Sequence, residues 1–174
     1  MKRFFALLLG CAVLLPLGSM TSCGYRVGGI KPAMMQGLQT FHVEMFENFS
    51  TQPLLAMQLT TALTDALQAD GTYKLASPAS SDFVIRGQVL SVTPRSLSSD
   101  WRDSYLSSEI GLKITYHYEV INRKTGKTLL STTASSQTSY YNRENINMQT
   151  TRDNALSYGA RLAAQSIVSR LAGT

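Results

Sequence analysis

Cysteine is almost missing from this chain of 174 residues, which contains only Cys11 and Cys23. Cys11 lies within the apolar run Phe4–Leu17, which follows two basic residues and precedes small and polar ones, the layout of a secretory signal. If cleavage follows Ser22, the mature chain keeps a single thiol at its first position. An intrachain disulfide is then excluded, although a compartment beyond the inner membrane would permit one.

The groupings of residues that catalysis requires are also missing. The two histidines, His42 and His117, lie far apart, and neither has a cysteine or a cluster of acids beside it. The sequence has no serine elbow of the G-x-S-x-G type and no phosphate-binding glycine loop. We therefore predict no catalytic residues and no metal site, and we expect a binding or assembly role rather than an enzyme.

Long apolar runs and strong charge are absent as well. The run Phe4–Leu17 is shorter than the roughly 20 residues that a membrane-spanning helix needs, and Pro16 interrupts it. The net charge of +5 falls to +3 after removal of the signal, with 14 basic against 11 acidic residues scattered along the chain. Without a basic arm, nucleic acid is not an expected partner.

The remaining sequence predicts one domain. We assign residues 1–22 to a signal peptide that is removed, 23–39 to an N-terminal tether and 40–174 to a single α+β domain. A mature chain of 152 residues can bury roughly 68–70% of its unfolded surface, so it needs no disulfide to stabilise its core.

Hydrophobic periodicity predicts the elements of this domain. Period-two patterns indicate strands at 41–46, 83–93, 109–121 and 128–141, and apolar stripes at helical spacing indicate helices at 54–70 and 151–171. A short strand is also expected at 73–75. In the first strand Phe41, Val43 and Met45 are expected to share one face, opposite Phe46, and Pro94 is expected to end the second strand. The fold class is α+β, with two amphipathic helices packed on one face of a mostly antiparallel four- or five-stranded sheet.

The strand at 128–141 is unusual because Ser, Thr, Ala and Gln fill both of its faces between Leu130 and Tyr140. Two interpretations stay open. The strand is either an edge strand or lies on the wet side of the sheet, or it faces a polar, water-filled partner surface.

The residues Met20–Cys23 resemble the lipobox of bacterial lipoproteins, in which an apolar residue and two small ones precede a modified cysteine. This resemblance implies cleavage before Cys23 and acyl chains on its thiol and new amino group, which together hold a protein to a bilayer. Gly24 follows where an aspartate would signal retention, which points to the outer membrane. The alternative is a buried or reactive thiol at Cys23.

Four stretches together resemble the lipopolysaccharide-assembly lipoprotein family of the LptE type: "CGYRVGG" from Cys23, "FHVEMFENFSTQP", "LTTALTDALQADG" and "SDFVIRGQVLSV". The resemblance implies an outer-membrane lipoprotein, anchored on the periplasmic side, that binds and helps assemble a β-barrel translocon for lipopolysaccharide. Its implied partners are that barrel, lipopolysaccharide and the membrane, with no cofactor besides the acyl chains. The alternative is a lipoprotein that activates a periplasmic cell-wall synthase or forms part of a secretion assembly.

Given this resemblance, basic residues in two predicted loops are candidates for contact with the phosphates of lipopolysaccharide, because an arginine fork holds phosphate in two places. The candidates are Arg95 and Arg102 near the single tryptophan, and Arg123, Lys124 and Lys127 in the hairpin. The alternative for each is a solvated surface charge, and Asp100 and Asp103 could neutralise the first loop.

Overall fold

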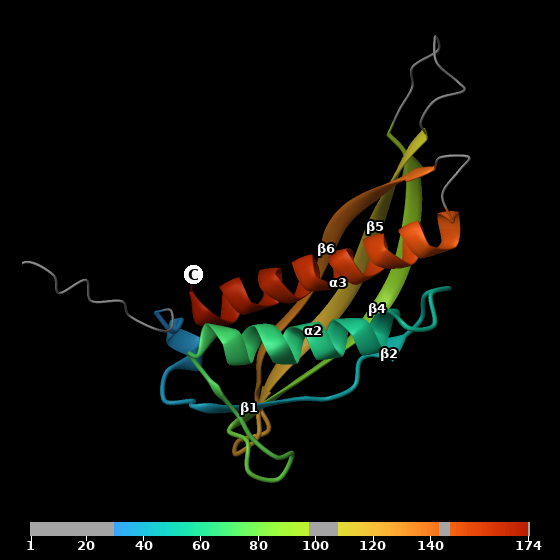
Figure 1. Ribbon diagram of the computed structural model, residues 1–174. Helices are drawn as coiled ribbons and strands as arrows, with labels where there is room; N and C mark the ends of the chain where they lie inside the picture. The colour runs from blue at the N-terminus through green and yellow to red at the C-terminus, as the bar shows by residue number, and fades with distance from the viewer. Residues whose placement is uncertain (1–29, 98–107, 143–146, 174) are drawn as a thin grey trace, which may run out of the picture.

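The structure is a computed structural model of the chain, and it describes residues 30–97, 108–142 and 147–173. Two helices lie side by side across one face of a twisted sheet (Figure 1). In chain order the elements are η2 (Ala33–Met35), β1 (Thr40–Val43), β2 (Glu47–Asn48), α2 (Leu55–Asp70), β3 (Lys74–Leu75), β4 (Phe83–Ser96), β5 (Ser108–Asn122), β6 (Thr128–Asn142) and α3 (Met148–Ala172).

The sheet has six strands in the order β3-β1-β4-β5-β6, with β2 paired to β4. The long ladders β4–β5 and β5–β6 are antiparallel, whereas β1 pairs in parallel with β3 and β4, and β2 pairs in parallel with β4. The predicted fold class is confirmed, but the sheet is mixed and has six strands instead of four or five. Strand β3 confirms the short strand predicted at 73–75, and the additional strand β2 contains two residues, too few to produce a visible alternation.

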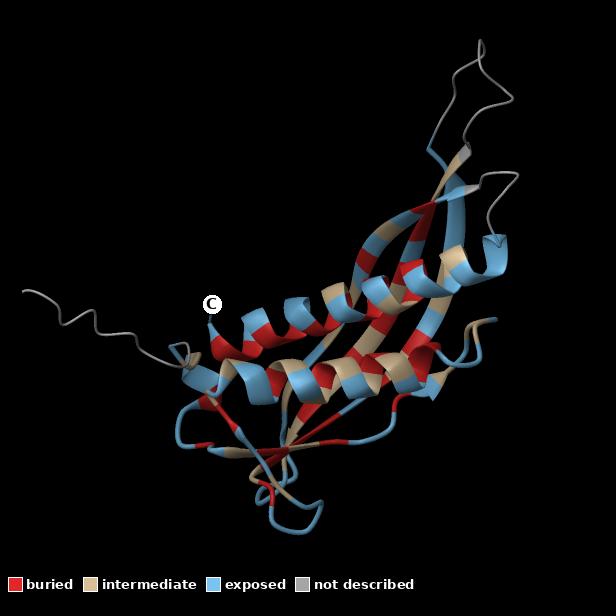
Figure 2. Ribbon diagram, viewed as in Figure 1, coloured by how far each residue is buried: buried red, intermediate tan, exposed pale blue. Residues whose placement is uncertain are grey.

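The core lies between the helices and one face of β5. Leu112, Ile114, Tyr116, Tyr118 and Val120 alternate along β5 and are at most 2% exposed. Figure 2 shows the buried positions of the helices and of the sheet turned toward one another. The alternation predicted for this strand is therefore confirmed, and its other side chains lie on the face away from the helices.

Helix α2 buries Leu55, Leu59, Leu63 and Leu67, which lie on one face because they are spaced by four residues. It ends where Gly71 adopts a left-handed conformation with φ of 75°, as the sequence predicts. The burial of this stripe, not a capping side chain, holds the helix in place, because no side chain caps its first residues.

Helix α3 begins three residues earlier than predicted, at Met148, because the Asn147 side chain accepts hydrogen bonds from two backbone amides of the first turn. Small residues let this helix approach the sheet closely. At Gly159 a Cβ atom would lie 2.6 Å from Cδ1 of Ile114, and the Ser136 hydroxyl donates a 2.9 Å hydrogen bond to the Gly159 carbonyl. The buried polar Ser136 is therefore satisfied by the helix backbone.

The segment before β1, which the sequence assigned to a tether, contributes to the core from η2 onward. Met35 is fully buried and Leu38 is 7% exposed. The Lys31 ammonium lies 4.8 Å from the centre of the Tyr73 ring and donates to the Leu38 carbonyl. The Tyr73 hydroxyl donates to the carbonyl of Leu171, and burial followed by nearby Asp70 raises the pKa of Tyr73 to about 12.

Two local predictions are wrong. Strand β4 continues through Pro94, which pairs with Leu112. The pairing of β2 with β4 stops at Val89, so no described strand lies beside the outer side of β4 at Pro94, and no backbone N–H donor is needed there. After β1 the alternation also fails, since Phe46 is 2% exposed and Met45 is 64% exposed. Strand β1 ends at Val43, after which the Phe46 amide donates to the hydroxyl of Thr60 on α2.

Candidate functional site

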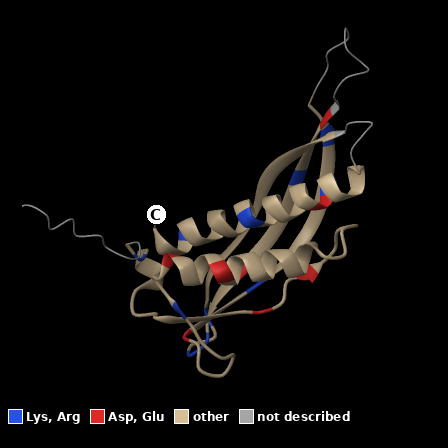
Figure 3. Cartoon of the chain, viewed as in Figure 1, with Lys and Arg blue, Asp and Glu red and all other residues tan. Residues whose placement is uncertain are grey.

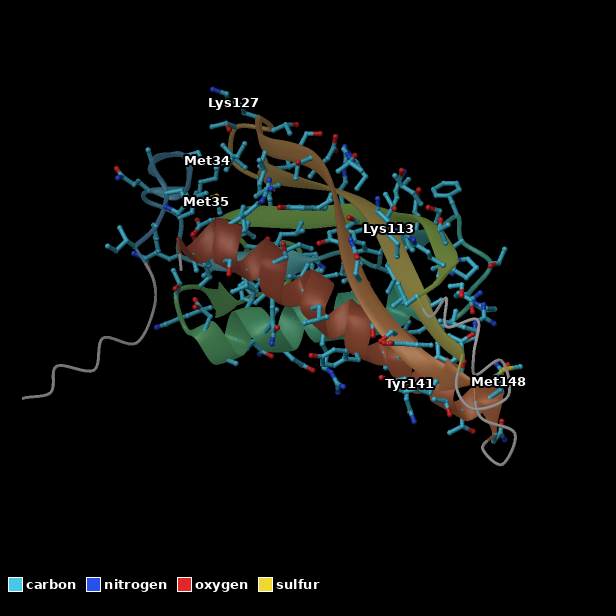
Figure 4. All side chains as sticks on the ribbon, turned by 90° about the horizontal axis from the view of Figure 1, so that it is seen from above. Met34, Met35, Lys113, Lys127, Tyr141 and Met148 are labelled. Atoms are coloured by element: carbon cyan, nitrogen blue, oxygen red, sulfur yellow. The ribbon has the colours of Figure 1, made fainter. Side chains whose placement is uncertain are left out.

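The structure separates the predicted basic residues into two groups at opposite ends of the long strands. Arg95 lies near the end of β4, whereas Arg123, Lys124 and Lys127 lie in the β5–β6 hairpin at the other end. Figure 3 shows the basic residues dispersed over the molecule, and Figure 4 shows Lys127 far from Tyr141 and Met148. Arg102 and Cys23 lie outside the described residues.

Within the hairpin, Lys124 is engaged in a structural contact. Its ammonium lies 2.8 Å from a carboxylate oxygen of Asp82, and the Arg123 amide donates to the Asp82 backbone carbonyl. The other carboxylate oxygen of Asp82 accepts hydrogen bonds from the Gln39 and Thr40 amides and from the Thr40 hydroxyl. Asp82 thus joins the hairpin to the start of β1, and the charge of Lys124 is largely balanced.

This arrangement also fixes the protonation state of Asp82. Lys124 is the first cause that lowers the pKa of the Asp82 carboxyl well below its ordinary value, and the hydrogen bond from the Gln39 amide is the second. The carboxyl side chain is 15% exposed. Asp82 is therefore ionised in the folded protein down to strongly acidic pH.

The face of the sheet opposite the helices is polar over most of its length, with apolar Val84 and Ile121 at its hairpin end. We call this surface the polar sheet face, and its side chains from β4, β5 and β6 are Arg86, Gln88, Lys113, Thr115, His117, Glu119, Ser131, Thr133, Ser135 and Gln137. All of them are partly or fully exposed. The surface presents both hydrogen-bond donors and acceptors. Its charged side chains are two basic ones, Arg86 and Lys113, and one acidic one, Glu119.

Cross-strand contacts order the hairpin-proximal half of this face. The Arg86 guanidinium lies 2.9 Å from the Glu119 carboxylate across the β4–β5 ladder, and this contact lowers the pKa of Glu119. The hydroxyl of Ser131 donates to Glu119, and the His117 ring lies 3.1 Å from the hydroxyl of Thr133. The two predicted solvent-facing histidines are thus partly exposed strand residues, and the described residues contain no group of three side chains that could hold a metal ion.

At the end of the sheet remote from the hairpin, a cleft of about 530 Å³ brings Arg95 and Lys113 together with apolar side chains. We call it the distal cleft, and it is lined by Arg95, Leu97, Gly111, Leu112, Lys113, Gln137, Thr138, Ser139 and Tyr158. Leu97 and Tyr158 are each 51% exposed, and the Arg161 guanidinium lies 5.8 Å from the centre of the Tyr158 ring. Cationic and apolar groups side by side suit an anionic amphiphile.

Only one member of the distal cleft was a candidate from the sequence. Lys113 was assigned to the polar side of its strand, and Tyr158 was not singled out. The register that places Thr93 opposite Lys113 and Arg95 opposite Gly111 brings the two cations to one end of the sheet. Gly111 leaves room for Leu97, whose Cδ1 lies 3.0 Å from the position a Cβ would occupy.

Taken together, the described residues form a two-layer α+β fold with one open polar face. No helix among the described residues has the length and apolar character needed to cross a membrane. The chain belongs to the lipopolysaccharide-assembly family LptE, whose family model matches residues 38–171. Membership implies a non-catalytic role in lipopolysaccharide assembly, as the resemblance indicated.

Solved structures share the fold at low sequence identity. The hypothetical protein CT253 from Chlamydia trachomatis is 10% identical with a TM-score of 0.55, and the match covers 78% of this chain and 96% of that one. Protein XCC0632 from Xanthomonas campestris is 12% identical, with a TM-score of 0.52 and coverages of 82% and 88%. A lipoprotein predicted in Caulobacter crescentus CB15 is 13% identical, with a TM-score of 0.51 and coverages of 74% and 88%.

At these identities the similarity concerns the fold alone. A sequence comparison with curated proteins finds no significant match. The family model, which spans most of the domain, therefore carries the functional assignment.

The contact between Asp82 and Lys124 yields a prediction about stability. Asp82→Asn should lower the free energy of unfolding by about 2 kcal/mol at pH 7, because charge-assisted hydrogen bonds to the Gln39 and Thr40 amides are weakened. Because the pKa of Asp82 is lower in the folded state than in the unfolded state, its ionised form stabilises the fold at any pH above the unfolded pKa of about 3.9. This stabilisation is lost as the pH falls through the folded-state pKa. The difference from wild type should therefore shrink below about pH 4.

Urea denaturation between pH 2 and pH 7 measures this difference. Asp65→Asn, at an exposed position on α2, is the matched control and should change stability by less than about 0.5 kcal/mol at pH 7. Equal stability of Asp82→Asn and wild type at pH 7, or a difference that widens in acid, would contradict the assigned role of Asp82.

Proposed function

We propose that this chain is an outer-membrane lipoprotein, acylated at Cys23, that binds and helps assemble the β-barrel translocon delivering lipopolysaccharide to the cell surface. The observation that carries the proposal is the polar sheet face, within a chain of the lipopolysaccharide-assembly family. A barrel wide enough to enclose another protein has a polar, water-filled interior. The Ser, Thr and Gln side chains of this face can form hydrogen bonds with such a wall, and Arg86 and Glu119 on it are paired with each other.

The distal cleft would hold a phosphate group of lipopolysaccharide. Arg95 and Lys113 supply positive charge, while Leu97 and Tyr158 supply apolar surface for the acyl part of the same molecule. Arg102 is proposed for the same contact because it follows Arg95 closely in the sequence. Arg123 and Lys127 at the hairpin remain candidates, whereas Lys124 already has Asp82 as its partner.

The tether supports an anchored arrangement. Ile30 lies against the C-terminal end of α3, where a Cβ at Gly173 would clash with the Ile30 carbonyl oxygen. Ile30 therefore lies at the end of the domain where both helices terminate, and the distal cleft is lined by Tyr158 in the third turn of α3. The helix from Tyr158 to its end spans about 22 Å, so the proposed lipid contact is well separated from Ile30.

Binding to purified lipopolysaccharide tests the distal cleft. The double variant Arg95→Glu/Lys113→Glu should bind at least about tenfold more weakly at low salt, because two charge-assisted contacts are replaced by repulsion. Arg123→Glu/Lys127→Glu makes the same change of charge at the hairpin, the second candidate group, and loss of affinity in that variant alone would place the contact at the hairpin instead. Equal loss in both variants would indicate a non-specific charge effect, and full affinity of the cleft variant would remove the cleft from the site.

Replacement of the proposed anchor residue tests the lipoprotein assignment. Cys23→Ala should leave a full-length, unprocessed precursor, because the acylated cysteine is required before cleavage in the lipoprotein pattern that Met20–Cys23 resembles. Mass spectrometry of the membrane fraction distinguishes the precursor from the 152-residue form. Normal cleavage of the variant, with no loss of membrane attachment, would rule out Cys23 as the anchor.

A further inference from the structure

Apart from a register shift near its start, between Thr128 and Leu130, the outer edge of β6 lacks the features that prevent strands from pairing with other chains. β6 is the terminal strand of the sheet, and no strand of the described residues pairs with its outer side. Its 15 residues, "TLLSTTASSQTSYYN", include no charged residue, proline or glycine. Proteins normally protect exposed edges with charge, proline, bulges or short strands. Such protection is present at the other side of the sheet, where β3 has two residues and the free part of β4 contains Pro94 and Arg95.

Several side chains of β6 also mirror one another about Ser135, although Ala134 differs from Ser136 and Thr133 differs from Gln137. Ser131 and Ser139 lie four positions on either side of it, Thr132 and Thr138 lie three positions away, and Leu130 and Tyr140 lie five positions away. If two β6 strands paired in antiparallel orientation with Ser135 opposite Ser135, serine would face serine, threonine would face threonine and leucine would face tyrosine. Such like-with-like and apolar cross-strand pairs stabilise a sheet.

We propose that the chain, when free of another partner, pairs with a second copy of itself through β6, in antiparallel register centred on Ser135. The result is a two-fold dimer with one continuous sheet across both copies. A strand from an unrelated protein would give no reason for β6 to mirror its own sequence. A second copy gives that reason, because in a two-fold interface each position meets its mirror position.

The two faces of β6 are compatible with this register. Positions related by the two-fold axis are both odd-numbered or both even-numbered, so exposed residues such as Ser131 and Ser139 meet on the polar sheet face. The even-numbered residues, which lie toward α3, meet one another on the other face. Pairing therefore extends the polar sheet face of one copy into that of the other and places no charged side chain of β6 in the interface.

A cleft beside β6 provides space for the second copy. It has a volume of about 420 Å³ and is lined by residues of β6 and α3, with none from β5, among them Thr138, Tyr140, Ala155 and Tyr158. In the proposed register Leu130 of the second copy lies opposite Tyr140, at the mouth of this cleft. The apolar side chain would then cover Tyr158, which is 51% exposed in the single chain.

Cysteine cross-linking tests the register. In a full-length chain with Cys11→Ser and Cys23→Ser, purified in mild detergent, Ser135→Cys introduces the only thiol. Directly opposite residues in an antiparallel pair lie within disulfide range, so mild oxidation should cross-link this variant into a dimer. Ser131→Cys is the matched control on the same face, and it should cross-link at least about tenfold less, because two copies of position 131 lie about 27 Å apart.

A second pair of variants keeps the test independent of any effect of Ser135→Cys on folding. Thr133 lies opposite Gln137 of the second copy, so mixed Thr133→Cys and Gln137→Cys chains should cross-link with each other more than either does alone. Ser135→Lys should convert the free chain from the mass of two copies to the mass of one by light scattering, since the introduced lysines would face each other. Equal cross-linking at positions 131 and 135, or a wild-type chain with the mass of a single copy at high concentration, would overturn the proposal.

Discussion

Burial of one face of β5 beneath the two helices is the constraint on which the rest of this structure depends. Every second residue from Leu112 to Val120, five in all, is almost inaccessible to solvent. Because side chains alternate along a strand, the register of β4 and β6 around β5 is fixed by that burial, and a shift of one residue would move the whole apolar set into water. The same register builds the polar sheet face and brings Arg95 near Lys113.

The polar and apolar layers also explain how a chain without disulfides, metal or a catalytic cluster in its described part can serve assembly. Its helices supply the apolar surface that stabilises the domain, so the opposite face of the sheet is free to contact other molecules. Short, parallel-paired strands and Pro94 limit one side of the sheet, and the uncharged β6 forms the other. A member of a lipopolysaccharide-assembly family therefore offers a face, an edge and a terminal cleft, each with a different chemistry.

Long periodic segments made much of the fold predictable. The strict alternation of β5, the glycine-containing hairpin and the leucine stripe of α2 each repeat often enough for the sequence to specify the element. Strand β2 was not predictable, because two residues carry no period and its pairing depends on contacts with β4, whereas β3 lies within the short strand predicted at 73–75. Pro94 within β4 and the buried Phe46 also depend on where neighbouring strands end.

The sequence indicated which residues could form the candidate site, but not which of them lie together in the fold. The sequence identified Arg95 and the hairpin cations but could not show that Lys124 pairs with Asp82, a residue 42 positions away from it. Nor could it show that Lys113 and Tyr158 join Arg95, because this depends on the β4–β5 register and on the angle of α3 across β6. The assignments at Cys23 and Arg102 remain predictions, since both residues lie outside the described part of the chain.

The central claim is that the polar sheet face contacts the barrel. Photo-cross-linking in native outer membrane, with the probe at Thr115 on that face and at Gln165 on the exposed side of α3 as a comparison, tests it most directly. The account predicts that Thr115 cross-links to an integral β-barrel protein at least as strongly as Gln165 does. Cross-links to a barrel from Gln165 alone, or from neither position, would contradict it.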